Sequence, residues 1–375
     1  MPIEAVAGTV LASLTLAHLG TLAAVAWRVR PARAEPAPPD RPPVSIVRPL
    51  RGLEPHLEAN LAATFALDWP AFEILFCVAD PDDPAIPLVE RAIAAHPKVP
   101  ARLLVGDDRI SINPKLNNTV KGFRAARHGW ILMIDSNVEA PPDLLARLLA
   151  AWRPGTGLVC SPPVGGRAEG FWAALECAFL DTYQTRVQLT ADMAGHGFAQ
   201  GKVMLYRRDI LQAIGGIEAL AAEPAEDAAT TKLLRARGYR IRLARRPFAQ
   251  TLGRRTFAEV WHRQVRWARL RRDTFPHWYA LEILAGALPP ALALLVVAPF
   301  EGWACGPALL ALLALWYGAE AMLARVAGWN LGLRSLPALL LRDLLLPAVW
   351  VAGWCGRGFV WRGNAMRLPA PARGG

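Results

Sequence analysis

Residues Glu223 to Arg272 read EPAEDAATTKLLRARGYRIRLARRPFAQTLGRRTFAEVWHRQVRWARLRR and combine an acidic pair with a dense block of arginines. Glu226 and Asp227 open a helix-like run, and the cations and indole of Arg263–Trp267 follow about a helix and a strand later. A carboxylate can accept a proton, and arginines can hold a diphosphate. The alternative is that the acids only favour a helix N-terminus and that the arginines form a solvated face.

Hydrophobic residues make up 53% of the 375 residues, but they are concentrated towards the two ends of the chain. The middle reads as an α/β domain, whereas both ends carry apolar runs of membrane length. The formal net charge of +11 requires an anionic partner. Because the basic residues gather beside apolar runs, we expect an anionic lipid membrane and no nucleic acid. The five cysteines lack metal-type or disulfide spacing and are expected to be small buried hydrophobes.

Residues 1–30 are predicted to form an N-terminal transmembrane anchor. From Ala5 to Trp27 the chain is apolar apart from His18 and a few small polar residues, which is long enough to cross a bilayer. We expect His18 to make a helix–helix contact. Arginines follow directly, so the positive-inside rule places the next domain in the cytoplasm. Residues 31–43, rich in Pro, Ala and charge, are predicted to be a linker.

Residues 44–275 are predicted to form a cytoplasmic α/β domain. Short apolar runs typical of buried strands occur at Val44–Val47, Glu73–Val78, Ala101–Val105, Trp130–Ile134, Leu158–Cys160 and Val203–Tyr206. We expect turns at Arg48–Gly52 and at Gly165–Gly166, and helices from Asn113 to about His128 and over Gly170–Leu189.

Acidic residues follow two of these strands, Asp80 after the second and Asp135 after the fourth. Open α/β sheets bind ligands at the carboxyl ends of their strands. Asp135 is therefore placed to bind a divalent cation that carries a nucleotide diphosphate. The alternative for the acids around Asp80 is a solvated turn.

Three further residues are candidate substrate contacts. Lys115 and Asn117 lie in the first turn of a predicted helix above the sheet edge, where they could hold uridine or phosphate oxygens. Lys202, just before the sixth strand, is a candidate phosphate or headgroup contact.

If Arg263, Arg266 and Trp267 are helical, they share one face, because residues three and four apart are neighbours.

Residues 276–375 are predicted to form a C-terminal membrane region. Three apolar segments cover Leu281–Phe300, Trp303–Val326 and Leu336–Cys355, with interruptions at Pro289-Pro290 and Arg342-Asp343. Re-entrant helices are possible where neighbours satisfy the backbone. The basic tail, with Arg357, Arg362 and Arg367, indicates a cytoplasmic end and an even number of spans. Three C-terminal spans, or one span and two re-entrant helices, both satisfy this.

Several motifs together resemble the membrane-bound family-2-like glycosyltransferases, with their three-aspartate and (Q/R)xxRW signature. The chain is most similar to ceramide glucosyltransferases, through RPLRG, CVADPDDPAI, INPKLNN, IDSN, AEDAATTKL and RQVRW. The resemblance covers roughly Val44 to Arg272 and, in hydrophobic layout, both ends. It implies a GT-A (Rossmann-like) domain held by N-terminal and C-terminal transmembrane helices.

The resemblance also implies a role for individual residues. Asp80 would contact uracil or ribose, and Asp135 would serve the metal and the diphosphate. Asp227 would be the general base, and Arg263, Arg266 and Trp267 would close over the leaving diphosphate and the acceptor. The remaining candidate substrate contacts are Pro49, Leu50 and Glu226.

Two departures from the family pattern limit what is carried over. Asn137 replaces the second acid of a DxD, so ligation of the expected divalent cation, Mg²⁺ or Mn²⁺, falls largely on Asp135. Gln184 and Phe198 lie where the eukaryotic enzymes carry a histidine and a cysteine, so acceptor and inhibitor behaviour does not transfer.

The expected reaction is a single inverting transfer from a UDP-sugar, with glucose as the first candidate, to the primary hydroxyl of ceramide. One alternative is transfer of N-acetylglucosamine to a hopanoid polyol by the same mechanism. Another is a catalytically inactive lipid-binding scaffold. A processive polysaccharide synthase would need more C-terminal spans. The high Ala, Arg, Pro and Gly content suits a GC-rich bacterial genome, so the expected location is the bacterial inner membrane, with the catalytic domain on its cytoplasmic face.

Overall fold

The computed structural model describes residues 2–31, 40–356, 358–361 and 364–367. It forms two compact units. The sheet unit contains residues 32–167 and 191–253, and the helical unit contains residues 1–31, 168–190 and 254–375. The predicted domain of residues 44–275 therefore contributes to both units, because residues 168–190 and 254–275 group with the hydrophobic helices. Most of the predicted linker lies outside the described residues.

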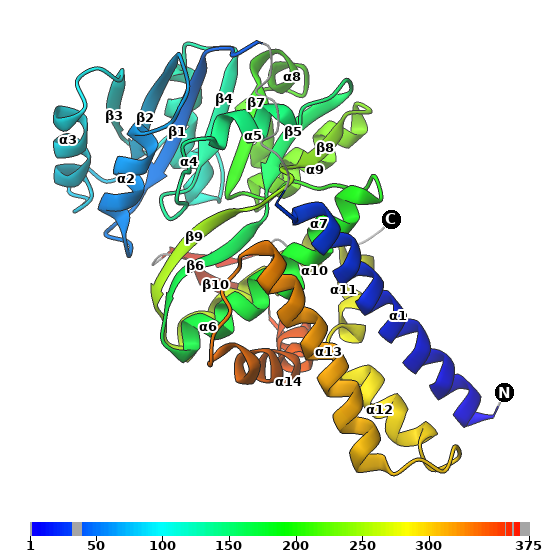
Figure 1. Cartoon of the computed structure of the whole chain (residues 1–375). Helices are drawn as coiled ribbons and strands as arrows, with labels where there is room; N and C mark the ends of the chain where they lie inside the picture. The colour runs from blue at the N-terminus through cyan, green and yellow to red at the C-terminus, as the bar shows by residue number, and fades with distance from the viewer. Residues whose placement is uncertain (1, 32–39, 357, 362–363, 368–375) are drawn as a thin grey trace. The chain divides into compact units, whose positions relative to one another are not determined.

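A mixed seven-stranded sheet in the order β3-β2-β1-β4-β7-β5-β8 organises the sheet unit (Figure 1). Strands β1 to β4 run parallel, and β7 runs antiparallel to β4 and β5. The strands are β1 (Val44–Leu50), β2 (Phe72–Val78), β3 (Ala101–Val105), β4 (Trp130–Ile134), β5 (Thr156–Ser161), β7 (Val203–Arg207) and β8 (Arg240–Leu243). The six predicted strands are confirmed, and a parallel sheet with crossover helices is the architecture of a nucleotide-binding α/β fold.

The predicted turn after the first strand is wrong, because β1 continues through Leu50. Pro49 pairs with Cys77 of β2, and Leu50 is 1% exposed. Proline normally argues against a central strand, since it lacks an N–H for the ladder. Here β4 pairs with β1 only as far as Val47, so Pro49 lies where β1 has a neighbouring strand on one side alone.

The predicted turn at Gly165-Gly166 is also wrong. Both glycines lie inside β6 (Pro163–Glu169), which pairs with β9 (Phe248–Arg254) in a separate two-stranded sheet. A Cβ on Gly166 would lie 3.0 Å from the Cβ of Ala249. Gly166 lacks a side chain because the two strands approach each other closely here, and not because the chain turns.

Helices cover both faces of the main sheet, as expected for a parallel core. One face packs against α2 and α3 through residues such as Leu61, Phe65 and Val89. On the other face α4 lies so close that a Cβ on Gly122 would be 2.6 Å from Val47 and 2.7 Å from Cys77. The helices of this unit are α2 (Leu57–Phe65), α3 (Ile86–Ala95), α4 (Pro114–Ala125), α5 (Leu144–Ala150), α8 (Arg208–Ala213), the 3₁₀ helix η2 (Ile217–Ala222) and α9 (Glu226–Ala236).

The helical unit contains the predicted membrane segments. Its elements are α1 (Ile3–Val29), α6 (Phe171–Ala178), the π-helix η1 (Phe179–Thr185), α7 (Arg186–Met193), α10 (Phe257–Thr274), α11 (Pro276–Leu281), the 3₁₀ helix η3 (Glu282–Leu284), α12 (Leu288–Val297), α13 (Cys305–Ala327), α14 (Ser335–Trp354), β10 (Gly358–Trp361) and β11 (Asn364–Arg367). Helix α7 continues three residues beyond this unit. The predicted helix over Gly170–Leu189 is confirmed as α6, η1 and the start of α7.

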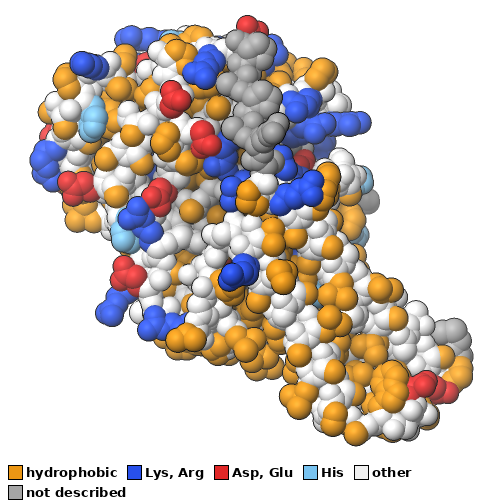
Figure 2. All heavy atoms as spheres, in the orientation of Figure 1, with side chains coloured by type: hydrophobic (Ala, Val, Ile, Leu, Met, Phe, Trp, Pro, Cys, Tyr) orange, Lys and Arg blue, Asp and Glu red, His pale blue; other side chains and the backbone are white. Residues whose placement is uncertain are grey.

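Within the described residues, α1, α13 and α14 are long and apolar enough to cross a membrane. The pair Pro276–Leu284 and Leu288–Val297, bent by 48°, makes a fourth span if it crosses as one unit. Helices α1, α12 and α13 lie side by side, and Figure 2 shows hydrophobic side chains over most of their surface. Exposed apolar residues there include Leu16, Leu292 and Leu310. Three helices of membrane-spanning length and hydropathy, together with this exposed apolar surface, indicate a membrane protein.

The two predicted interruptions, Pro289-Pro290 and Arg342-Asp343, have different effects on the helices. Pro289-Pro290 lies in the first turn of α12, where proline is tolerated, and coincides with the bend. Arg342-Asp343 does not interrupt α14, because both side chains are buried and paired. Arg342 contacts Glu320 of α13 at 2.8 and 2.9 Å and Asp343 at 2.7 Å.

The expected helix–helix contact of His18 is confirmed. Its ring stacks on Trp316 of α13 with centroids 3.5 Å apart, and its Nε2 lies 3.3 Å from the Trp316 carbonyl oxygen. Of the five free cysteines, Cys77, Cys160 and Cys177 are buried as predicted, whereas Cys355 is exposed. In the basic tail, Arg357 and Arg362 lie outside the described residues.

Candidate active site

The INPKLNN motif forms the start of α4, and each polar side chain in it has a different structural task. Asn113 is the N-cap, and its Oδ1 accepts from the backbone N–H of Lys115 at 2.9 Å. Its Nδ2 donates to Glu226 Oε2 at 2.7 Å. Asn118 Nδ2 donates to the carbonyls of Leu50 and Cys77, which ties the ends of β1 and β2 together. The cap and these ties fix the first turn of α4 above the sheet edge.

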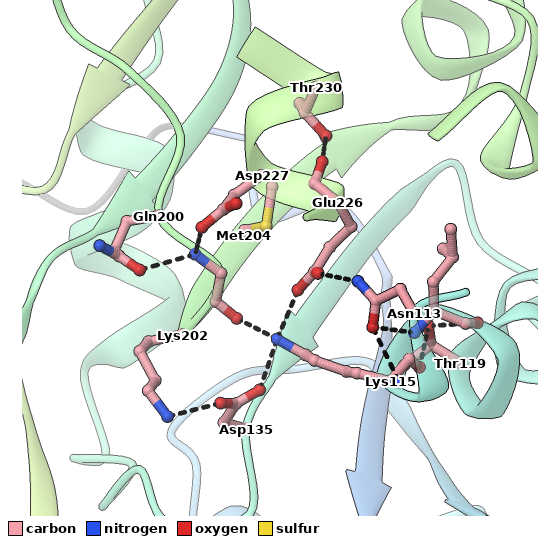
Figure 3. A network of polar contacts seen from close by, with 12 residues as sticks. Asn113, Lys115, Thr119, Asp135, Gln200, Lys202, Met204, Glu226, Asp227 and Thr230 are labelled. Carbon is pink, nitrogen blue, oxygen red and sulfur yellow. Dashed lines mark hydrogen bonds and ion pairs between the residues drawn. The ribbon is translucent and has the colours of Figure 1, made fainter. Parts of the chain in front are cut away.

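Lys115 is the centre of the polar network in Figure 3. Its Nζ lies 2.7 Å from Asp135 Oδ1 and 2.8 Å from Glu226 Oε1, and it donates to the carbonyl of Gly201. The lysine side chain is only 11% exposed. Burial opposes a charged ammonium, yet the two acids hold the pKa of Lys115 above its usual range.

Asp135 and Lys202 meet because β7 runs antiparallel to β4. Ile134 pairs with Val203, so the residue after β4 lies beside the residue before β7. Lys202 Nζ lies 2.7 Å from Asp135 Oδ2 and 3.4 Å from Asn137 Oδ1. Burial opposes ionisation of Asp135, but Lys115 and Lys202 keep its pKa below the usual range.

Asp227 lies in the first turn of α9, half-buried beside Glu226. Its Oδ2 accepts from the Gly201 N–H at 3.0 Å, and its Oδ1 accepts from the Ala228 N–H at 2.8 Å. Burial and the neighbouring Glu226 raise the pKa of Asp227 to about 6, while Lys115 acts in the opposite direction. An acid with a pKa near 6 is ionised at neutral pH and is a better proton acceptor than an ordinary aspartate.

Gly201 lies where three charged groups converge. A Cβ at this position would lie 2.9 Å from Glu226 Oε1, 3.3 Å from Asp227 Oδ2 and 3.4 Å from Lys115 Nζ. A larger residue at this position would therefore displace these charged groups from their present positions.

Gly201→Ala is therefore expected to lower turnover about ten- to a hundredfold, because its methyl displaces Asp227 and Glu226 from their positions. Steady-state kinetics measures the loss. The matched control is Gly129→Ala, since a Cβ on Gly129 meets nothing within 4 Å. Equal rates for the two variants would contradict the close-approach argument.

The other predicted substrate contacts in the sheet unit differ in how exposed their side chains are. Asp80 follows β2 and is exposed, so its carboxylate is open to a ligand at the sheet edge. Asn117 is buried and holds the preceding loop, accepting from the N–H groups of Ile110 and Ser111. Pro49 and Leu50 are buried in β1. Only Asp80 of these four side chains is exposed.

Two residues that position the sheet edge were missed by the sequence analysis. Arg48 is fully buried in β1 and donates to the carbonyls of Ser136 and Val138, just after Asp135. Burial lowers the pKa of Arg48 to about 10. Asp83 accepts from the Gly52 N–H at 2.9 Å, which ties the end of β1 to the acidic turn after β2. Gly52 is a turn residue, with φ of 66° in the structure, and it was the sequence signal that could have pointed to the contact with Asp83. No local sequence pattern indicates that Arg48 is buried.

The Arg263–Trp267 run lies on α10 in the helical unit, so the predicted helix is confirmed. A capping box between Thr256 and Glu259 starts this helix. Arg263 forms an ion pair with Glu176 of α6, which is buried, and its guanidinium carbon lies 5.9 Å from the Trp267 ring centre. Gln264 is buried and accepts from Gln184 Nε2 at 2.8 Å. These contacts anchor α10 within its unit, while Arg266 and Trp267 remain partly exposed.

The site offers few ligands for a divalent cation. Among the residues that the structure describes, no group of three or more His, Cys, Asp or Glu side chains could hold a metal ion. Asp135 and the Asn137 amide supply hard oxygen donors at the end of β4, as Mg²⁺ prefers. One carboxylate and the substrate's phosphates fit such an ion, provided that it takes the place of Lys202 beside Asp135.

The sequence matches the family model for glycosyl transferase family 21 over residues 9–373. Ceramide glucosyltransferase 1 of Caenorhabditis elegans is 29% identical over 256 residues, which cover 68% of this chain and 55% of the relative. Ceramide glucosyltransferase 3 of the same organism is 26% identical, over 87% of this chain and 73% of the relative.

One solved structure supports the fold. A mannosyltransferase from Pyrobaculum calidifontis, in complex with GDP-Man and Mn²⁺, superposes with a TM-score of 0.53 at 20% identity, over 94% of this chain and 98% of the other. The fold is thus GT-A-like, and the family match extends over both units of the structure. The chain belongs to glycosyltransferase family 21.

Proposed function

We propose that the chain transfers glucose from a UDP-sugar donor to the primary hydroxyl of ceramide, with inversion, to give β-glucosylceramide. The observation that carries this proposal is the half-buried Asp227, with its raised pKa, beside the Lys115 and Asp135 network. The names of the relatives favour ceramide as the acceptor. The aligned part of the first relative is about half of its length, so the acceptor remains part of the proposal.

In the proposed step, the acceptor hydroxyl oxygen attacks the anomeric carbon of the sugar. The bond from that carbon to the diphosphate oxygen breaks, and the hydroxyl proton passes to the Asp227 carboxylate. A single displacement of this kind inverts the α-linked donor to a β-glycoside. Arg263, Arg266 and Trp267 would act on the leaving diphosphate and the acceptor, where arginine stabilises developing negative charge.

Donor binding is assigned to the carboxyl edge of the sheet. Asp80 would contact uracil or ribose, and Lys202 would face the diphosphate. If the enzyme uses a divalent cation, Asp135 would hold it, and the cation would supply positive charge against the leaving group. The mannosyltransferase of the same fold was solved with Mn²⁺, which supports a divalent cation in general.

The membrane context supports a lipid acceptor. The apolar helices α1, α13 and α14 would hold the enzyme in a bacterial inner membrane, with the sheet unit on the cytoplasmic side. The arginines that follow the α1 span favour this orientation and would contact anionic headgroups. Anchoring brings a cytosolic sugar nucleotide and a bilayer acceptor together, which reduces the entropic cost of their encounter.

The rate is expected to depend on pH with a limb near pH 6. Because the pKa of Asp227 is raised to about 6, the carboxyl is protonated below that pH and cannot accept the hydroxyl proton. We therefore expect kcat/KM to fall about tenfold per unit below pH 6 and to level off above pH 7. Activity measured from pH 4.5 to 9 checks this. A profile that stays flat down to pH 4.5 would contradict the assignment of Asp227.

The function itself is tested with a substrate matrix. Detergent-solubilised protein is mixed with UDP-glucose, UDP-galactose or UDP-N-acetylglucosamine, each with ceramide or a hopanoid polyol, and the lipid products are identified by mass spectrometry. Hexosyl-ceramide is the expected product. N-acetylglucosaminyl-hopanoid alone would keep the mechanism and change both substrates. Absence of any product would favour the lipid-binding scaffold.

A further inference from the structure

The ammonium of Lys115 lies among three oxygen atoms inside the protein: it forms ion pairs with Asp135 and Glu226 and donates a hydrogen bond to the Gly201 carbonyl. The two carboxylate atoms are Asp135 Oδ1 at 2.7 Å and Glu226 Oε1 at 2.8 Å. Two carboxylates therefore oppose the single positive charge of the ammonium, whose side chain is only 11% exposed. The charge that the sequence suggested for a phosphate oxygen is thus already paired inside the protein.

The acceptors of Lys115 come from three separate parts of the sheet unit. Asp135 follows β4, Gly201 precedes β7, and Glu226 starts α9, while Lys115 itself is on α4. Two of these acceptors are linked onward to the proposed base. Gly201 donates its N–H to Asp227 Oδ2 at 3.0 Å, and Glu226 is the immediate neighbour of Asp227. Figure 3 shows Asp135 and Glu226 pointing toward the lysine from these elements.

We propose that Lys115 is a positioning residue, which holds Asp135, Glu226 and the Gly201 turn in place around Asp227 and does not itself bind the diphosphate. This inference rests on the proposed role of Asp227 as the general base. It also assigns Glu226, which the sequence placed among the substrate contacts, to the same support, since Lys115 and Asn113 contact its two oxygens.

The geometry has an electrostatic consequence that can be measured. The charged groups facing Asp227 are Glu226 from α9 and Lys115 from α4, with the phenol of Tyr206 from β7 nearby. Asp135 and Lys202 are paired with each other. The positive charge of Lys115 lowers the pKa of Asp227, and the negative charge of Glu226 raises it. Removing the charge of Lys115 should therefore move the acidic limb of the kcat/KM profile to higher pH, and removing the charge of Glu226 should move it to lower pH.

The experiment compares the pH profiles of kcat/KM for wild type, Lys115→Met and Glu226→Gln. Lys115→Met is expected to move the limb upward by about one pH unit or more, as loss of a nearby opposite charge does. Glu226→Gln is expected to move it downward. Misfolding does not produce opposite shifts, so the pair separates positioning from general damage. If Lys115→Met does not fold, the pH profiles of Glu226→Gln and Lys115→Arg are compared with that of wild type instead.

Lys115→Arg keeps the positive charge and is expected to return the limb to near its wild-type position, even though the altered geometry lowers kcat. UDP affinity, measured by titration calorimetry, is expected to change less than about tenfold in Lys115→Met, because Lys115 acts on the donor only through Asp135. A loss above about tenfold in UDP affinity with an unmoved limb would overturn the inference and make Lys115 a substrate contact. Limbs unmoved in both charge variants would overturn it as well.

One further variant, Asp227→Asn, distinguishes failure of the proposed function from failure of the positioning role of Lys115. If Asp227→Asn retained the wild-type rate, the base assignment itself would be lost. If Asp227→Asn abolished turnover but the charge variants left the limb in place, only the positioning role of Lys115 would be lost.

Discussion

Replacing Asp227 with Asn is expected to lower kcat by about 10²- to 10⁴-fold, the usual contribution of a positioned general base. The amide keeps the size of the side chain, and its oxygen can still accept from the Gly201 N–H. It cannot take the proton of the acceptor hydroxyl. The loss should therefore appear in turnover of UDP-sugar and lipid acceptor, measured with purified protein in detergent.

Binding of the donor should survive this substitution. We expect the affinity of Asp227→Asn for UDP to remain within about threefold of wild type in titration calorimetry, because the assigned donor contacts are Asp80, Asp135 and Lys202. Asp209→Asn is the matched control, since its side chain is 61% exposed and pairs only locally with Arg207. Asp209→Asn should keep the wild-type rate. Wild-type turnover in Asp227→Asn would remove the central assignment.

Replacing Arg342 with Met is expected to destabilise the helical unit by about 3–5 kcal/mol, the typical cost of breaking a buried ion pair. Arg342 is 1% exposed and is the shared ion-pair partner of Glu320 and Asp343, which are also buried. Its guanidinium also donates to Thr182 of η1 at 2.9 Å. Methionine fills a similar volume but leaves two buried carboxylates without their cation. Thermal unfolding in detergent should show the loss as a markedly lower melting temperature.

The control for this prediction is Arg334→Met, just before α14, where the side chain is exposed. It should leave the melting temperature nearly unchanged. A second test replaces the charged cluster as a whole, with Glu320→Leu, Arg342→Met and Asp343→Leu together. Because the desolvation cost of all three groups then disappears, stability should recover towards wild type. A melting temperature of Arg342→Met equal to that of Arg334→Met would show that the cluster contributes little.

The INPKLNN motif shows how far sequence reasoning reached in the candidate site. The helix start was predictable, because proline at the first turn after an asparagine cap is a local signal. The contacts that the polar side chains of this motif make could not be predicted from the sequence. Asn117 holds its own preceding loop, and Lys115 contacts acids at positions 135 and 226. Those partners are set by strand order and direction, which no window of the sequence contains.

Local sequence patterns predicted six strands of the main sheet, the apolar segments at both ends, and the acids that follow β2 and β4. These are local properties, fixed by hydrophobic periodicity and by the residues that end a strand or begin a helix. Even the wrong predictions had local causes, since proline in β1 and paired glycines in β6 are ordinary turn signals.

Which charged side chains come into contact depends on how the chain folds in three dimensions. Antiparallel β7 brings Lys202 to Asp135, and α4 delivers Lys115 between Asp135 and Glu226. In the helical unit, Arg342 of α14 is neutralised by Glu320 of α13, so a predicted interruption becomes an internal ion pair. Burial makes such groups depend on partners far along the chain, because an ion removed from water is stable only beside an opposite charge.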